Sequence, residues 1–179
     1  LSQSARALAV RFLERYRQGA RQIPLRDLTE AIKRIGYDPA AMAQLFEADL
    51  MTVLRRLACL PADEGAARAG LVVCDASGTL TFHKPVDGFP LPRFGAACPL
   101  LPIYEALGRP MQPLRRVVEL PGATPKRFLT YAISQPANPA AFDGPTVFEA
   151  AMLPGLATMR ARIHSQCPAN RARDSGEEL

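Results

Sequence analysis

Proline divides this chain of 179 residues into parts that must fold differently. Before residue 61 only Pro24 and Pro39 occur, and both stand where a helix could begin. In contrast, twelve of the 17 prolines fall between Pro85 and Pro145. Because proline lacks a backbone N–H, it interrupts helices and central strands. We therefore expect regular helices in the first third of the chain and ordered loops or strand edges in the proline-rich segment.

Apolar residues recur at helical spacing through the first sixty residues. This periodicity predicts four helices, beginning near Ser4, Pro24, Asp38 and Asp49. Gly36 is placed to end the second helix, and Pro61 follows the fourth. The first part of the chain is therefore expected to be entirely helical.

After a small, polar connection at 61–70, the pattern becomes that of strands. Residues 70–83 are predicted to form a hairpin with Leu80 and Phe82 on one face, and residues 113–134 a second hairpin. Between them, "IYEALG" predicts a short helix ended by Gly108. The segment "TVFEAAML" fits either a strand or a short helix.

These elements indicate an α+β fold, with a helical module packed on a mainly antiparallel sheet that carries a long proline-rich insert. The expected organisation is a helical module at 1–62, a β-rich effector-binding domain at 63–155 and a weakly helical to disordered tail at 156–179. With 48% hydrophobic residues and no apolar run of transmembrane length, the sequence predicts a cytoplasmic protein without a membrane partner.

Motifs of catalysis or metal binding are missing from the sequence. Only His83 and His164 could act as imidazole bases, and no nucleotide-binding loop or nucleophile elbow is present. The four cysteines are scattered without a C-x-x-C pair, which favours isolated buried thiols over a disulfide framework or a metal site. We therefore expect neither an enzyme nor a metalloprotein.

Cations and aromatic residues are interleaved in and around the proline-rich segment. Arginine binds phosphate through a planar fork of donors, and aromatic faces suit a base or an acyl chain. The alternative is a well-packed loop whose arginines face solvent. The candidate ligand-binding residues are Arg93, Phe94, Cys98, Tyr104, Arg109, Arg116, Arg127, Phe128 and Tyr131.

Residues 38–60 also have the outline of a helix-turn-helix, which leaves a DNA-binding or protein-interaction module as the alternative function. The second helix of this segment offers few side chains that could read bases, and Asp49 near its start would repel phosphate. The net charge of +5 is too modest to decide the matter.

A series of short motifs runs through the proline-rich segment and the second hairpin. They are Arg93-Phe94-Gly95, Cys98-Pro99, Glu105-Ala106, Pro110, Glu119-Leu120-Pro121 and an aromatic strand at Phe128. With the helical segment 28–60 before it, this series resembles the C-terminal part of bacterial short-chain fatty acyl transcriptional regulators, over residues 25–153. The C-terminal cysteine cluster typical of that family is not matched here, so the resemblance implies no metal site in this chain.

The resemblance implies an effector domain that senses acyl-coenzyme A and controls genes of short-chain fatty acid metabolism. Coenzyme A or its acyl thioester would then be an effector rather than a required cofactor. DNA would be bound by a helix-turn-helix domain upstream of Leu1, which would explain why the sequence does not begin with Met. Such regulators act as oligomers, and exposed strand edges would allow a homodimer.

Overall fold

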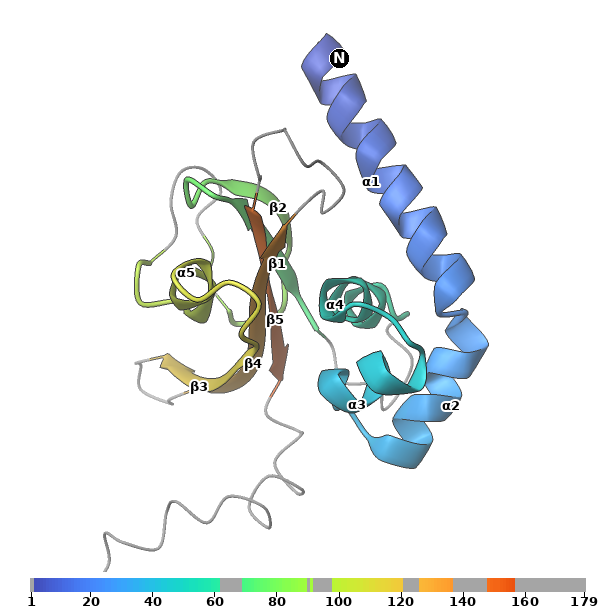
Figure 1. The fold of residues 1–179 in the computed structure, drawn as a ribbon. Coiled ribbons are helices and arrows are strands. Elements are labelled where there is room, and N and C mark those ends of the chain that lie inside the picture. Colours follow the sequence, from blue (N-terminus) through green and yellow to red (C-terminus); the bar gives the residue numbers. More distant parts are fainter. Residues whose placement is uncertain are drawn as a thin grey trace, which may run out of the picture.

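The computed structural model describes residues 2–61, 69–89, 91, 98–120, 126–136 and 148–156. Helices cover both faces of one antiparallel sheet, and the four N-terminal helices precede the strands in the chain, which confirms the predicted α+β class (Figure 1). One face carries α1 (Gln3–Gln22), α2 (Leu25–Ile35), α3 (Pro39–Leu45) and α4 (Leu50–Ala58). The other face carries α5 (Pro102–Leu107), the short helix expected within the proline-rich insert. No helix in these ranges is long and apolar enough to cross a membrane.

The helices begin where capping residues satisfy the free N–H groups of the first turn. The Ser2 hydroxyl accepts a hydrogen bond from the backbone N–H of Ala5. The Asp38 carboxylate accepts two from the start of α3, and the Asp49 carboxylate accepts one from the start of α4. At the end of α2, Gly36 adopts a φ of 74°, a conformation that favours glycine. The four predicted helices are therefore confirmed.

The sheet is antiparallel throughout, in the order β2-β1-β5-β4-β3. Its strands are β1 (Leu71–Asp75), β2 (Leu80–Lys84), β3 (Leu114–Leu120), β4 (Lys126–Pro136) and β5 (Phe148–Leu156). Both predicted hairpins are present as β1–β2 and β3–β4. The segment that fitted either a strand or a helix forms β5, which lies in the centre and joins the two hairpins.

A β-bulge corrects the expected orientation of β2. Val73 pairs with Phe82 but the next residue, Cys74, pairs with Leu80, so β2 has one extra residue at this point. Phe82 therefore packs with the helices on one face, whereas Leu80 packs on the α5 face. The prediction that Leu80 and Phe82 share a face is wrong, because simple alternation along a strand fails across a bulge.

Two apolar clusters hold the layers together, one on each face of the sheet. The cluster between the sheet and α1–α4 includes Leu28, Leu54 and Leu153, which are at most 2% exposed. The cluster under α5 includes Ile103, Phe128 and Met152, all 0% exposed. Because both faces of the central strands are covered, β5 is apolar along most of its length.

Helix α4 is the central helix of the first layer, between α1 and the sheet. None of its nine residues is exposed, and six are buried. The buried Arg56 side chain donates to the backbone oxygen of Ile23 at 2.9 Å. A DNA-reading helix needs a free face for the major groove, so the burial of α4 argues against the helix-turn-helix alternative.

Truncation of Leu54 tests how much the apolar cluster between the sheet and α1–α4 stabilises the fold. Leu54→Ala leaves a cavity at a 0% exposed site and should lower the free energy of unfolding by about 2–5 kcal/mol. The matched control is Leu100→Ala, because Leu100 is 90% exposed and should change stability by less than about 0.5 kcal/mol. Urea denaturation of both variants checks this, and equal losses would contradict it.

Candidate ligand groove

The cations predicted to bind phosphate are engaged in ion pairs wherever the structure describes them. Arg116 lies 2.5 Å and Arg109 lies 3.3 Å from the Glu105 carboxylate. The hydrogen bond from Arg116 is the main reason why the pKa of Glu105 lies below its usual value. Arg127 lies 2.5 Å from Glu119. These arginines therefore pair with carboxylates on an exposed surface of the described structure, and two of them share Glu105.

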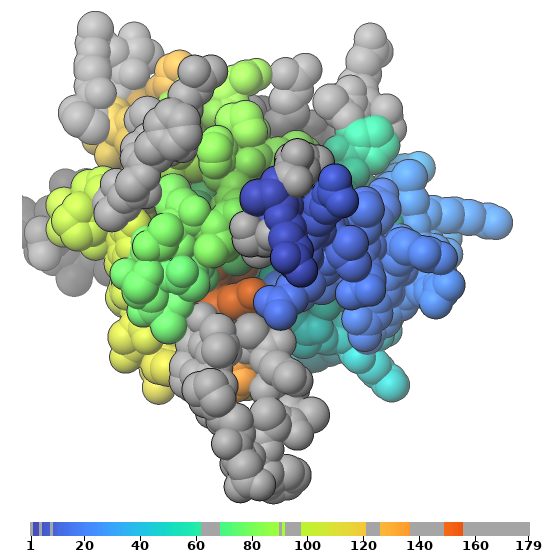
Figure 2. All heavy atoms as spheres, turned by 90° about the horizontal axis from the view of Figure 1, so that it is seen from above, coloured from blue at the N-terminus to red at the C-terminus, as the bar shows by residue number. Residues whose placement is uncertain are grey.

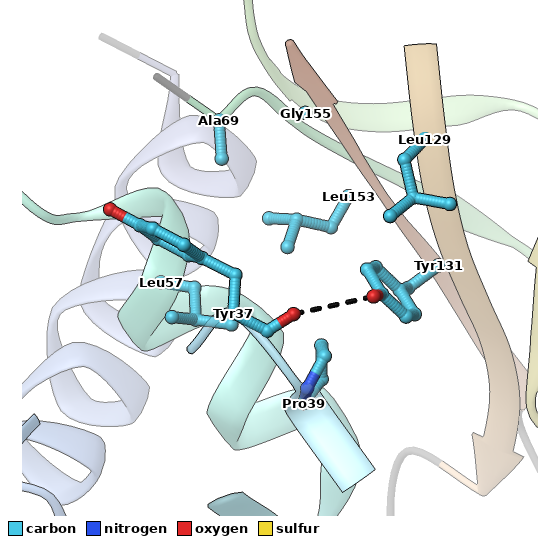
Figure 3. Close-up of a pocket in the computed structure, with 8 residues that line it drawn as sticks. All are labelled: Tyr37, Pro39, Leu57, Ala69, Leu129, Tyr131, Leu153 and Gly155. Carbon is cyan, nitrogen blue, oxygen red and sulfur yellow. Dashed lines mark hydrogen bonds between the residues drawn. The ribbon is translucent and has the colours of Figure 1, made fainter. Parts of the chain in front are cut away.

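The predicted aromatic residues are separated by the sheet itself. Phe128 is 0% exposed on the α5 face and meets the ring of Phe89 edge-on, with 5.0 Å between centroids. Tyr131 points to the helical face, where its hydroxyl donates to the backbone oxygen of Tyr37 at 3.3 Å (Figure 3). The cavity beside Tyr131 has a volume of about 10 Å³, room for roughly one water molecule and for no larger ligand.

The remaining members of the predicted set are also dispersed. Tyr104, on α5, donates to the backbone oxygen of Gly78 at 3.2 Å. Cys98 is exposed, and Arg93 and Phe94 lie outside the described residues. Since these residues do not converge within the described part of the chain, the site predicted from the sequence stays a prediction.

The cysteines differ from the expectation of buried thiols. Cys74 is buried, and burial raises its pKa to about 11, so its thiol is protonated at neutral pH. Cys59 and Cys98 are exposed free thiols, and Cys167 lies outside the described residues. Among the residues described, no three His, Cys, Asp or Glu side chains lie close enough together to hold a metal ion.

A groove of about 640 Å³ lies elsewhere, between α1 and the β1–β2 hairpin. Figure 2 shows the start of α1, in dark blue, beside the green atoms of the β1–β2 hairpin. Helix α4 contributes Arg55 and Ala58, the residue after it contributes Cys59, and β5 contributes Glu149. A volume of this size is typical of small-molecule sites. The groove is therefore the candidate functional site of the described structure.

The apolar walls of the groove come from the first helix and the sheet. The rings of Phe12 and Phe82 stack across it, with centroids 5.0 Å apart and an interplanar angle of 27°. Leu71 and Val73 of β1 lie beside them. Although Phe12, Leu13 and Tyr16 belong to the apolar stripe of α1, they remain 42%, 57% and 45% exposed. These three apolar side chains of α1 therefore form an accessible wall of the groove.

The charged end of the groove is organised around Glu149. Its carboxylate accepts from Arg15 at 2.7 Å and from Arg55 at 3.1 Å. Burial and the neighbouring Arg15 charge lower the pKa of Arg55, while Glu149 opposes this effect. Two guanidinium groups thus share one carboxylate, which leaves positive charge at this end.

Other lining residues add to the positive charge. Arg11 and Lys84 bring the cations in the groove to four, against the carboxylates of Asp75 and Glu149. The Lys84 ammonium donates to the backbone oxygen of Ala58, which ties β2 to the end of α4. The groove therefore joins an apolar wall to an excess of cations.

The candidate ligand-binding residues predicted from the sequence include none of the residues that line this groove, so the sequence did not reveal the site. The available signal was the row of Phe12, Leu13 and Tyr16 beside Arg11 and Arg15. However, nothing in the local pattern shows that α1 stands away from the sheet along part of its length. A site formed between distant segments has no compact sequence signature.

A polar cavity of about 460 Å³ adjoins the groove and shares Arg15, Arg55 and Glu149 with it. Asp49 lines this cavity and accepts from the Thr52 hydroxyl at 2.5 Å and from the Gln135 amide at 3.0 Å. Burial acts to raise the pKa of Asp49, but these hydrogen bonds outweigh it and hold the pKa below the usual value. The ionised carboxylate therefore stabilises the contact between α4 and β4.

Comparison with known proteins identifies the family. Residues 68–171, more than half of the chain, match the family described as "Short-chain fatty acyl coenzyme A regulator, C-terminal". The chain belongs to the short-chain fatty acyl-coenzyme A regulator family. The resemblance found in the proline-rich segment is thereby confirmed, and the match extends through all the strands and α5.

Two relatives of this regulator domain agree with the assignment. The chain is 31% identical over 134 residues to a protein of Cereibacter sphaeroides named "Propionyl-CoA carboxylase regulator". The alignment covers 74% of this chain and 29% of that protein. A solved structure named "Mycobacterium tuberculosis transcriptional regulator" matches with a TM-score of 0.68 and 26% identity, over 92% of this chain and 50% of that one. The chain thus spans half or less of the length of these relatives.

The regulator domain should lose stability at low pH through Asp49. Because the folded pKa is lowered, the stabilisation is complete above the unfolded pKa of about 3.9 and is lost as pH falls through the folded pKa. Asp49→Asn keeps a capping side chain but removes the charge. We expect wild type to be more stable than the variant at pH 7, with the gap narrowing below about pH 4. Thermal unfolding from pH 7 to pH 2.5 measures this, and a constant gap would contradict it.

Proposed function

We propose that this chain is the effector-binding domain of a bacterial transcriptional regulator and that it binds acyl-coenzyme A in the groove. Family membership supports an acyl-coenzyme A effector. The names of the two relatives, a propionyl-CoA carboxylase regulator and a transcriptional regulator, support a role in gene control. The observation that carries the assignment to the groove is the apolar wall beside an excess of cations.

The chemistry of the groove suits the two halves of an acyl thioester. Coenzyme A carries phosphate groups, for which Arg11, Arg15 and Lys84 supply charge-assisted donors. An acyl chain or the adenine ring would lie on Phe82 and the apolar residues of β1. The cations would bind the phosphate groups of acyl-coenzyme A. The apolar wall would bind its acyl chain or adenine ring, which inorganic phosphate lacks.

Control of transcription requires that binding moves something outside the groove. We propose that the ligand enters between α1 and β2 and displaces the stacked rings of Phe12 and Phe82. Helix α1 would transmit this movement to a DNA-binding segment joined at its N-terminus. The length of the relatives beyond the aligned region leaves room for such a segment.

Arg11 provides the first test of the groove. Arg15, the other groove arginine of α1, is less suitable because it also pairs with Glu149 of β5, so its removal could disturb the fold. Arg11→Ala should weaken acyl-coenzyme A binding about tenfold, or about 1.4 kcal/mol, through loss of one charge-assisted contact. Arg17→Ala is the matched control, an exposed arginine of the same helix that does not line the groove. Calorimetric titration with propionyl-coenzyme A measures both. No heat and no thermal shift with the unmodified chain at millimolar ligand would refute the proposed function.

A second variant decides between the groove and the site predicted from the sequence. Arg116→Ala removes a predicted phosphate-binding residue that the structure places on Glu105. If the ligand occupies the groove, the dissociation constant should stay within about twofold of the unmodified value, because distant surface changes are nearly independent. A tenfold loss in Arg116→Ala with no loss in Arg11→Ala would instead support the set around Glu105.

A further inference from the structure

The polar cavity beside the groove lies between the second half of α1, the start of α4 and the end of β4. Its volume of about 460 Å³ is within the range of small-molecule sites. Gln18, Gly19 and Gln22 of α1 line it, as do Gln135 and Pro136 of β4. The phosphate and apolar contacts proposed for the groove leave this cavity without an occupant.

The register of the sheet shows where the two cavities meet. Asp75 of β1, Glu149 of β5 and Gln135 of β4 are partners in one row across three neighbouring strands. Asp75 and Glu149 line the groove, whereas Glu149 and Gln135 line the polar cavity. Neighbouring strands are about 4.8 Å apart, so the outer members of this row are separated by about 10 Å. The cavities therefore meet at Glu149, and a ligand with an extended arm can occupy both.

The charges that line the polar cavity are balanced, unlike those of the groove. Two guanidinium groups, of Arg15 and Arg55, are matched by two carboxylates, of Asp49 and Glu149. The groove instead has four cations against two carboxylates. Because the charges around the polar cavity cancel, this cavity offers an anion no net attraction. Phosphate groups should therefore bind in the groove, and an uncharged group suits the polar cavity.

Uncharged hydrogen-bonding groups form much of the lining of the polar cavity. They are the side-chain amides of Gln18, Gln22 and Gln135 and the hydroxyl of Thr52. The amide nitrogen of Gln22 donates to a backbone oxygen at 3.1 Å, and that of Gln135 donates to a carboxylate at 3.0 Å. With their nitrogens engaged in this way, both side chains can still accept hydrogen bonds through their amide oxygens.

Donors come from the guanidinium groups at the junction with the groove. Arg15 binds Glu149 through Nη1, and Arg55 binds it through Nη2. A guanidinium carries N–H groups on all three nitrogens, so each arginine has donors beyond these contacts. The cavity thus combines donors with acceptors, which suits an amide group, because an amide donates through N–H and accepts through C=O.

We propose that the polar cavity binds the uncharged, amide-bearing pantetheine arm of the coenzyme A ligand. This inference rests on the proposed function and divides the ligand between the two cavities. The phosphate groups bind the cations of the groove, and the adenine ring lies on Phe82 and β1. The arm passes Glu149 and places its amides among the glutamine side chains. The acyl group is then carried into the polar cavity, and the apolar wall of the groove is occupied by the adenine ring.

Helix α1 forms walls of both cavities. At Gly19 it lies against α4, since an added Cβ would be 3.4 Å from Cδ of Arg56 and 3.5 Å from the methyl group of Thr52. Nearer its N-terminus, α1 stands away from the sheet and leaves the groove open. A ligand that occupies both cavities therefore contacts α1 along much of its length.

Gln18→Ala tests the polar cavity separately from the groove. Gln18 lines only the first of these two cavities and is exposed, so its truncation should leave the fold intact. We expect propionyl-coenzyme A to bind about fivefold more weakly, through loss of one hydrogen bond. The nucleotide half of coenzyme A, phosphoadenosine diphosphate, lacks the arm, so its dissociation constant should stay within about twofold. Gln3→Ala is the matched control, an exposed glutamine of α1 that lines neither cavity.

Two further variants separate the arm from the phosphates. Arg11→Ala should weaken both ligands, because both carry phosphate groups. Gln18→Lys adds a cation to the polar cavity and should tighten neither ligand, since the arm is uncharged. Tighter binding of the nucleotide half to Gln18→Lys would place a phosphate in that cavity and overturn the proposal. Calorimetric titration measures each affinity, and thermal unfolding checks that each variant folds.

The wild-type chain provides the last comparison. We expect it to bind propionyl-coenzyme A at least about tenfold more tightly than the nucleotide half, because the arm adds hydrogen bonds. Equal affinities would overturn the proposal for the polar cavity and leave the proposed function standing. An equal loss of both ligands in Gln18→Ala, or no loss of either, would do the same. If propionyl-coenzyme A does not bind the wild-type chain at all, the proposed function fails and this inference fails with it.

Discussion

The ion pairs of Glu149 connect the parts of this domain that lie farthest apart in sequence. The carboxylate stands on β5, the central and last strand, and binds Arg15 of α1 and Arg55 of α4. Burying charge is costly unless partners compensate it, and here two guanidinium groups share one carboxylate. The interaction therefore holds the first helix to the sheet while leaving positive charge beside the contact. The position of the groove follows directly from it.

The groove lies at the β2 end of the sheet, away from the other edge strand, β3. At the β2 end, α1 touches the sheet through the stacked rings of Phe12 and Phe82 and leaves the groove beside them. At the β3 end, Val117 is exposed. The central strands between the two edges are covered by an apolar cluster on each face. The groove therefore lies beside the buried centre of the sheet and is not part of either apolar core.

Local sequence was sufficient to predict the helices and hairpins, because their caps and turns depend on a few neighbouring residues. Caps at Asp38 and Asp49 predicted where helices begin, and turn residues predicted both hairpins. The assignment of Leu80 and Phe82 to one face failed, because a single bulged residue reverses the alternation. The family motifs in the proline-rich segment were recognised correctly, although motif order carries no information on which residues touch a ligand.

The sequence by itself determined the class of the fold, the helices and hairpins, and the family, since each depends on residues that are near neighbours in the chain. Only the tertiary structure decided that β5 inserts between the hairpins, that Phe128 and Tyr131 lie on opposite faces, and that Arg109 and Arg116 turn to Glu105. It also decided that the accessible groove lies beside α1. The physical reason is that strand order and ion pairing join residues far apart in sequence, where local periodicity gives no information.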